Sequence, residues 1–209
     1  MAEKKQRYIT PRGVAVFCMV NQPSVKFKKE GEYSIKLAFT AEEAQSLIEL
    51  LKPLLAEAVE EQKKTLKPAA KKTLKIAEPW SAELDEETGD ETGRLLFNFK
   101  MLAKVTSKKT GDIIELRPDL FDSRGNRIKP GSIKIGSGSE CKVAFTTRGY
   151  YMASDNKAGL TLDLQAVQVL KLVEWAGGMS AEAYGFEEEE GFDSSDFAVD
   201  GDATADGDF

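Results

Sequence analysis

The chain has 209 residues, of which 41% are hydrophobic and 31% charged, and its formal net charge is −6. This size and composition suit one globular domain with appendages, and no apolar run is long enough to span a bilayer, so we expect a soluble, cytoplasmic protein. Histidine is absent, which removes the commonest general base and metal ligand; we therefore expect no enzyme activity, no cofactor and no metal site.

The charge is divided sharply along the chain. Residues 182–209 contain eleven acids and no Lys or Arg, so the other 24 acids face all 29 bases and residues 1–181 carry about +5. Such a split indicates a basic surface for polyanions and a separate acidic arm. We therefore predict a folded domain over 1–179 and a disordered acidic tail over 180–209, which ends in Phe209.

In chain order, residues 1–13 are predicted to form a mobile basic arm that leads into a strand over 13–20. A basic loop or short hairpin is expected over 21–32. Residues 32–39 alternate between apolar and polar side chains, which predicts a strand. Its core face carries Tyr33, Ile35, Leu37 and Phe39.

A helix is predicted over about 40–64. Thr40 is a good N-cap residue and Glu43 stands three residues later, which makes a capping box. Apolar residues then recur at helical spacing, so one stripe should pack on the body. Pro53 is expected to kink the helix or divide it in two, and residues 60–75 are expected to be a fraying end and a loop.

An acidic, turn-rich loop is predicted over 82–93, and strands return after it. The strands are expected over 94–107, 112–118, 140–153 and 160–175. Short antiparallel strands with one inserted helix predict a mainly β protein with an OB-fold, that is, a five-stranded Greek-key barrel. A β-sandwich with a helical insertion is the alternative. Cys18 and Cys141 lie in strand-like segments, and we expect both to be reduced and buried.

The strongest local signal is the stretch 146–157, "TTRGYYMASDNK". Adjacent tyrosines on a strand point to opposite faces, so either Tyr150 or Tyr151 should face solvent. An exposed ring beside cations suits single-stranded nucleic acid, because the ring stacks on a base while the cations contact phosphates. The alternative is that both tyrosines only pack the core.

Further basic clusters lie at expected hairpin tips, where charged residues can also be simply solvated. Several such tips with interleaved aromatic residues favour a cationic groove. The predicted nucleic-acid-binding residues are Tyr150, Tyr151, Arg148, Lys142, Lys104, Lys108, Lys109, Lys157, Phe27, Lys26 and Lys28.

Four segments together resemble the bacteriophage T7-type single-stranded DNA-binding proteins. They are "FNFKMLAKVTSKKTGDIIELRPDLFDSRGNRI", "IGSGSECKVAFTTRGYYMA", "LTLDLQAVQVLKLVEWAGG" and the terminal "DGDF". The resemblance implies an OB-fold that binds single-stranded DNA without strong sequence preference, with roles in DNA replication, recombination and repair. It implies that Tyr150 stacks on DNA; Tyr151 and Phe27 are candidates for further stacking.

The resemblance also implies that the tail, through Asp206, Asp208 and Phe209, recruits replication proteins such as the phage DNA polymerase and helicase. A flexible polyanion should compete with DNA for the groove when DNA is absent. The expected location becomes the cytoplasm of the host cell. Two alternatives stay open: an RNA-binding or nucleic-acid chaperone module, and an adaptor acting only through the tail. The sequence does not determine the oligomeric state, and a homodimer is one of the possible states.

Overall fold

The computed structural model describes residues 6–175 except 27, 86, 108–109 and 130. The described residues all fall within the first of two compact units, Met1–Trp175. The predicted tail, with Asp206, Asp208 and Phe209, lies outside them.

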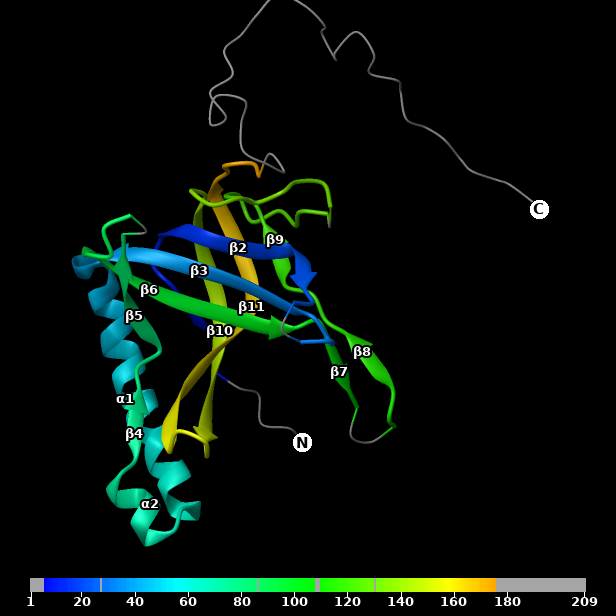
Figure 1. Cartoon of the computed structure of the whole chain (residues 1–209). Coiled ribbons are helices and arrows are strands. Elements are labelled where there is room, and N and C mark those ends of the chain that lie inside the picture. The colour runs from blue at the N-terminus through cyan, green and yellow to red at the C-terminus, as the bar shows by residue number, and fades with distance from the viewer. Residues whose placement is uncertain (1–5, 27, 86, 108–109, 130, 176–209) are drawn as a thin grey trace, which may run out of the picture. The chain divides into compact units, whose positions relative to one another are not determined.

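The described part of the chain is mainly β, as predicted (Figure 1). Its elements are β1 Tyr8–Ile9, β2 Gly13–Ser24, β3 Glu32–Thr40, α1 Ala41–Thr65, α2 Pro68–Lys72, β4 Lys75–Ala77, β5 Trp80–Leu84, β6 Glu91–Leu102, β7 Lys104–Thr106, β8 Ile113–Glu115, β9 Asp119–Phe121, β10 Glu140–Met152 and β11 Lys157–Lys171.

Five long strands close into a barrel. Around the ring β2 pairs with β3, β3 with β6, β6 with β11, β11 with β10, and β10 again with β2. Only the β6–β11 pairing in this ring is parallel, and the others are antiparallel. A closed five-stranded ring in this order, with α1 inserted between β3 and β6, is the predicted OB-type barrel rather than a two-sheet sandwich.

The alternation predicted for residues 32–39 is confirmed, because Tyr33, Ile35, Leu37 and Phe39 are all buried in the core. Phe39 meets Phe97 of β6 edge to face, with 5.5 Å between ring centroids. On the other face of these strands, Lys36, Asn98 and Lys100 border the site described below.

Helix α1 begins with the predicted capping box at Thr40 and Glu43. Its buried stripe of Ala44, Leu47, Leu51, Leu55 and Val59 packs on the barrel. Of the two effects expected for Pro53, a kink or a division, the division is wrong, because α1 runs unbroken through the proline. The buried Leu51 and Leu55 on either side of Pro53 outweigh the loss of one backbone hydrogen bond. Among the described helices, none is long and apolar enough to cross a bilayer.

Gly149 of β10 allows α1 to pack close to β10. A Cβ atom there would lie 3.0 Å from the Cβ atom of Ala58 on α1.

Three expected irregular segments contain regular structure. Residues 8–9 form β1, whose Tyr8 and Ile9 pair with β10, so the arm is anchored before residue 13. Residues 68–72 form α2, which Pro68 can begin because the first turn of a helix needs no amide donor there. The acidic stretch 82–93 belongs partly to β5 and β6, where Glu83 bonds to Thr92 and Arg94.

Both cysteines are free thiols, Cys141 being buried and Cys18 half-buried. Burial raises the pKa of Cys18 to about 11 and that of Cys141 to about 12. The thiols are therefore protonated at neutral pH and react slowly.

Candidate nucleic-acid interface

One groove of about 850 Å³ lies against the outer face of β10 and β11. Alternate residues of the two antiparallel strands point into it, as strand geometry requires. Facing pairs along the strands are Thr146 with Asp163, Arg148 with Thr161, and Tyr150 with Gly159. The other walls come from β3, β6 and the β7–β8 hairpin, and include Glu32, Lys100, Leu102, Val105 and Leu116.

The Tyr150 ring fits in this groove because the residue opposite it, Gly159, has no side chain. A Cβ atom at Gly159 would lie 2.7 Å from the hydroxyl oxygen of Tyr150 and 2.8 Å from two of its ring carbons. The ring therefore lies over the backbone of Gly159. It is half-buried and borders both the main groove and a neighbouring hollow, so an aromatic surface is available between the two.

Tyr151 points to the other side of β10. Its hydroxyl donates a hydrogen bond to Oδ1 of Asn156, 3.0 Å away, and its ring packs against the core. Nδ2 of Asn156 in turn donates to the carbonyl of Ala70 and to Oγ1 of Thr73, at 2.9 and 2.8 Å. The two tyrosines thus take different positions. Tyr150 lies in the groove, and Tyr151 belongs to a hydrogen-bond network that joins the β10–β11 turn to α2.

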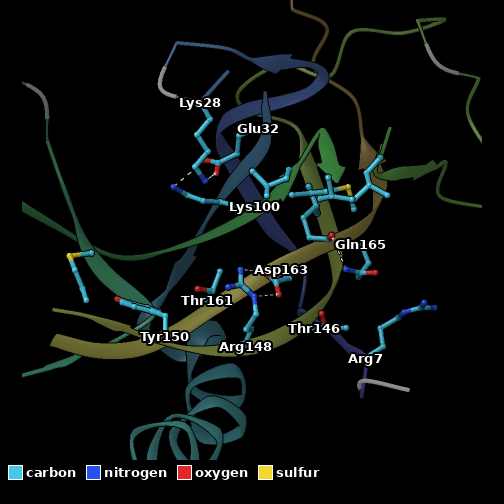
Figure 2. A pocket seen from close by; sticks show the side chains of 16 residues that line it. Arg7, Lys28, Glu32, Lys100, Thr146, Arg148, Tyr150, Thr161, Asp163 and Gln165 are labelled. Carbon is cyan, nitrogen blue, oxygen red and sulfur yellow. Dashed lines mark hydrogen bonds and ion pairs between the residues drawn. The ribbon is translucent and has the colours of Figure 1, made fainter. Parts of the chain in front are cut away.

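Two groups of cations in the groove are paired with carboxylates (Figure 2). Arg148 makes a two-pronged bond to Asp163, from Nε at 3.1 Å and Nη2 at 3.0 Å. This bond raises the pKa of Arg148 above its ordinary value. Glu32 pairs with Lys28, and its other oxygen lies 3.4 Å from Nζ of Lys100.

Burial and the two lysines shift the pKa of Glu32 in opposite directions. Burial acts to raise its pKa, but the hydrogen bond from Lys28 and the charge of Lys100 outweigh burial and hold the pKa below the usual range. Glu32 is therefore ionised at neutral pH. A phosphate that approaches Lys28 or Lys100 therefore meets a carboxylate that is already bound to these lysines.

A neighbouring hollow of about 420 Å³ continues the groove across β6 toward β5. It shares Tyr150 and Lys100 with the main groove and adds Lys36, Trp80 and Asn98. Within the described residues, Oδ1 of Asn98 is the one buried side-chain oxygen or nitrogen without a hydrogen-bond partner. An amide can both donate and accept, so rotation of Asn98 would offer a polar contact to a bound base.

The remaining predicted residues are dispersed. Lys104 pairs with Glu115 across the β7–β8 hairpin at 3.2 Å, and Lys26 lies in the exposed segment between β2 and β3. Lys142 faces outward on β10 opposite Gln168, and Lys157 begins β11 opposite Met152; neither is among the described residues that line the groove. Phe27, Lys108 and Lys109 lie outside the described residues.

The sequence did not indicate several residues of the groove and of the neighbouring hollow. They are Arg7, Glu32, Lys36, Asn98, Lys100 and Asp163. The alternation of β3 and β6 placed Lys36, Asn98 and Lys100 on the outer face, so that signal was available. It could not show that strands distant in the sequence would bring these residues together around Tyr150.

The arrangement suits binding rather than catalysis. The groove combines an aromatic ring, cations and an amide, which are the groups that single-stranded nucleic acid requires. Among the residues that the structure describes, no three acidic or cysteine side chains lie close enough to hold a metal ion. The carboxylates of the groove serve instead as partners of its cations.

Comparison with known protein families gives the same indication. A family model described as "Single-stranded DNA-binding protein, Bacteriophage T7" matches residues 13–172. The single-stranded DNA-binding protein of Escherichia phage T7 is 29% identical over 112 residues, which are 53% of this chain and 47% of that protein. The matched part thus spans about half the length of that relative.

Solved structures share the fold over a longer range. The crystal structure of gp2.5, a single-stranded DNA-binding protein encoded by bacteriophage T7, matches with a TM-score of 0.65 and 23% identity, over 90% of this chain and 98% of that one. The single-stranded DNA-binding protein of bacteriophage Enc34, in complex with single-stranded DNA, matches with a TM-score of 0.53 and 13% identity, over 82% and 89% of the two chains. At these identities the likeness concerns the fold.

Proposed function

Because the chain belongs to the family of bacteriophage T7 single-stranded DNA-binding proteins, whose function is binding rather than catalysis, we propose that it binds single-stranded DNA in the groove of β10 and β11. One observation carries the proposal: the ring of Tyr150 is held over Gly159 between two hollows whose walls carry Arg148, Lys36 and Lys100. A base would stack on the ring while the cations contact phosphates, with little sequence preference.

Binding in this groove is an exchange of anions. Phosphates would replace Asp163 on Arg148 and Glu32 on Lys28 and Lys100, which are contacts of equivalent geometry and charge sign. Since each phosphate contact also releases counterions from the DNA, affinity should fall as salt is raised.

The acidic tail is assigned two tasks. Its eleven acids and the basic body, about +5, favour competition between tail and DNA for the groove, so that DNA binding exposes the tail. The exposed tail would then recruit replication proteins such as a DNA polymerase or a helicase, with Phe209 as the apolar anchor. On this proposal residues 1–179 bind DNA, residues 180–209 bind partners, and the protein serves phage DNA replication, recombination and repair in the host cytoplasm.

The test is a fluorescence anisotropy titration with single-stranded DNA, duplex DNA and RNA of equal length. We expect single-stranded DNA to bind most tightly. Tyr150→Ala should lose about 1–3 kcal/mol of binding free energy for each base stacked, whereas Tyr150→Phe, which keeps the ring, should bind like the wild type.

Other results would contradict the proposal. A preference for RNA would favour an RNA-binding module, and no binding to any oligonucleotide would favour an adaptor that acts through its tail. A Tyr150→Ala variant with unchanged affinity would show that the tyrosine only packs the barrel.

A further inference from the structure

Two lysines lie side by side at the end of the groove where the β10–β11 turn meets α2. β4 runs parallel to the start of β11, with Lys75 in register with Lys157 and Ala77 in register with Gly159. Lys157 is two residues from Gly159, the residue beneath Tyr150. Side chains two residues apart on a strand share a face, so both lysines continue the outer face of the groove beyond Tyr150. We call Lys75 and Lys157 the lysine shelf.

The shelf differs electrostatically from the three carboxylate-paired cations of the groove. Arg148, Lys28 and Lys100 each contact a carboxylate. Within the described part of the chain, neither shelf lysine has an ion pair, even though Asp155 is close in sequence. Like charges directly opposite on neighbouring strands destabilise a sheet, so an arrangement of this kind costs stability unless an anion binds between the two lysines.

The shelf is rigidly connected to the turn beside Tyr150. The backbone amide of Lys75 donates to the carbonyl of Asn156 at 2.9 Å, and the side chain of Asn156 bonds to Tyr151, Ala70 and Thr73. Asn156 has a φ of 46°, a left-handed conformation that Asn adopts more readily than most residues. These bonds fix β4 against the β10–β11 turn, so the spacing between the shelf and Tyr150 is fixed before any ligand binds.

The short helix α2 strengthens the positive field there. Its last turn carries Lys71 and Lys72, and Lys67 precedes it. Figure 1 shows α2, β4 and the β10–β11 turn at the same end of the described body. The segment inserted between β3 and β6 thus places lysines of α2 near the end of the groove, in addition to packing α1 on the barrel.

We propose that the lysine shelf binds the phosphates of the DNA strand as it leaves Tyr150 toward α2. This inference rests on the proposed function and adds a second contact region to it. Because Lys75 and Lys157 need not release a carboxylate first, they contribute more to the salt dependence of binding than Arg148, Lys28 or Lys100 does.

The experiment compares two double variants of the full chain. Lys75→Gln with Lys157→Gln removes the shelf charges. Lys63→Gln with Lys64→Gln removes two lysines of α1 that are paired with Glu60 and Glu61, and it is the matched control. Affinity for a single-stranded oligo(dT) is measured between 50 and 200 mM salt for both variants and the wild type.

Two lost phosphate contacts should reduce the slope of log K against log salt by about 1.4 in magnitude, at about 0.7 per contact on single strands. When salt is raised fourfold, the affinity of the shelf variant should therefore fall by a factor about sevenfold smaller than that of the wild type. The control should change the slope by much less. Lys75→Arg with Lys157→Arg should restore the wild-type slope. The melting temperature of the glutamine variant should be unchanged or slightly higher, because the repulsion between the two lysines has been removed.

Any of four results would overturn the inference. Equal slopes for the shelf variant and the control would show that the shelf acts only through net charge. Tighter DNA binding by the shelf variant would show that the shelf holds the acidic tail instead. A wild-type protein that binds no single-stranded DNA would overturn the proposed function and this inference together, whereas wild-type binding with an unaltered slope in the shelf variant would overturn this inference alone.

Discussion

At the scale of single residues, two glycines without a Cβ atom allow close contacts that the barrel and the groove need. Gly149 and Gly159 pack against different neighbours, since a Cβ atom at Gly149 would meet Ala58 of α1 and one at Gly159 would meet Tyr150. The first glycine therefore serves the stability of the barrel, and the second serves the geometry of the groove.

Gly159→Ala is expected to weaken DNA binding while leaving the fold largely intact. The added methyl group must displace the Tyr150 ring, whose far end can swing into solvent, so the change should reproduce much of the loss of about 1–3 kcal/mol expected for losing a stacked base. Anisotropy titration measures the affinity, and thermal unfolding measures the stability.

Gly149→Val is the matched control for this prediction. It should lower the melting temperature because it forces α1 away from β10, yet the folded fraction should bind DNA with wild-type affinity. If Gly159→Ala instead lowers stability without affecting binding, Tyr150 is not the stacking residue.

Asp163→Asn should tighten DNA binding. Asp163 occupies the guanidinium of Arg148, which is 56% exposed, so removing its charge lets a phosphate bind without displacing a carboxylate. Exposed ion pairs contribute about 0–1 kcal/mol, and the gain should be of that size.

Glu140→Gln controls for the change in net charge, because Glu140 also contacts two cations, Arg12 and Lys171, at 3.2 and 3.9 Å. It is not among the described residues that line the groove. If Asp163→Asn weakens binding, Asp163 positions Arg148 for DNA rather than competing with it.

At the scale of elements, one ion pair joins β5 to β6 in addition to their backbone pairing. Glu83 accepts bonds from Thr92 at 2.6 Å and from Nε and Nη2 of Arg94 at 2.6 and 2.8 Å. Burial acts to raise the pKa of Glu83, but these bonds from Thr92 and Arg94 outweigh it and hold the pKa below the ordinary 4.5. The hairpin forms the wall of the neighbouring hollow that carries Trp80 and Ser81.

Glu83→Gln is therefore expected to destabilise the protein by about 1–3 kcal/mol at neutral pH, since it weakens bonds to a charged group. A carboxylate whose pKa is lowered on folding stabilises the folded state above its unfolded pKa, and this stabilisation is lost as pH falls through the folded value. The difference between wild type and variant, measured by urea unfolding, should shrink below about pH 4.5. A difference that stays constant down to pH 3 would contradict this assignment.

At the scale of the whole molecule, the sequence divides opposite charges between two parts of the chain. Residues 1–181 carry about +5 and residues 182–209 carry −11. Among the residues that the structure describes, three cations of the groove are paired with carboxylates, whereas the two shelf lysines are not. On the proposed function, the tail and a DNA strand would compete for the groove.

Deleting residues 182–209 should tighten DNA binding by about tenfold at low ionic strength, within the usual range of coupling between two ligands. The gain should fade as salt screens the attraction between tail and body. Titration of full-length and truncated protein at several salt concentrations measures it.

Phe209→Ala is the informative companion variant, because it keeps all eleven acids. It should keep the competition with DNA and lose the binding of replication proteins in a pull-down assay. Equal DNA affinity of the full-length and truncated proteins at low salt would exclude the competition.

Much of this protein is determined by local sequence. The capping box at Thr40 and the alternation of residues 32–39 predict α1 and β3 because helix and strand periodicity depend on neighbouring residues alone. The same holds for the placement of Tyr150 and Tyr151 on opposite faces. Segments with weak local patterns, such as β1, α2 and β5, were not predicted. Pairing with distant strands stabilises β1 and β5, and α2 and the residue after it accept hydrogen bonds from the distant Asn156.

Only the tertiary structure decides how the site is assembled. Asp163 bonds to Arg148, Glu32 joins Lys28 to Lys100, and Lys75 comes beside Lys157 because barrel closure brings together strands that are far apart in the chain. The sequence determines which side chains are cationic or aromatic, whereas strand register determines which cations are already neutralised and which remain available to an anion. That register depends on the packing of the whole core, and no local stretch of residues contains it.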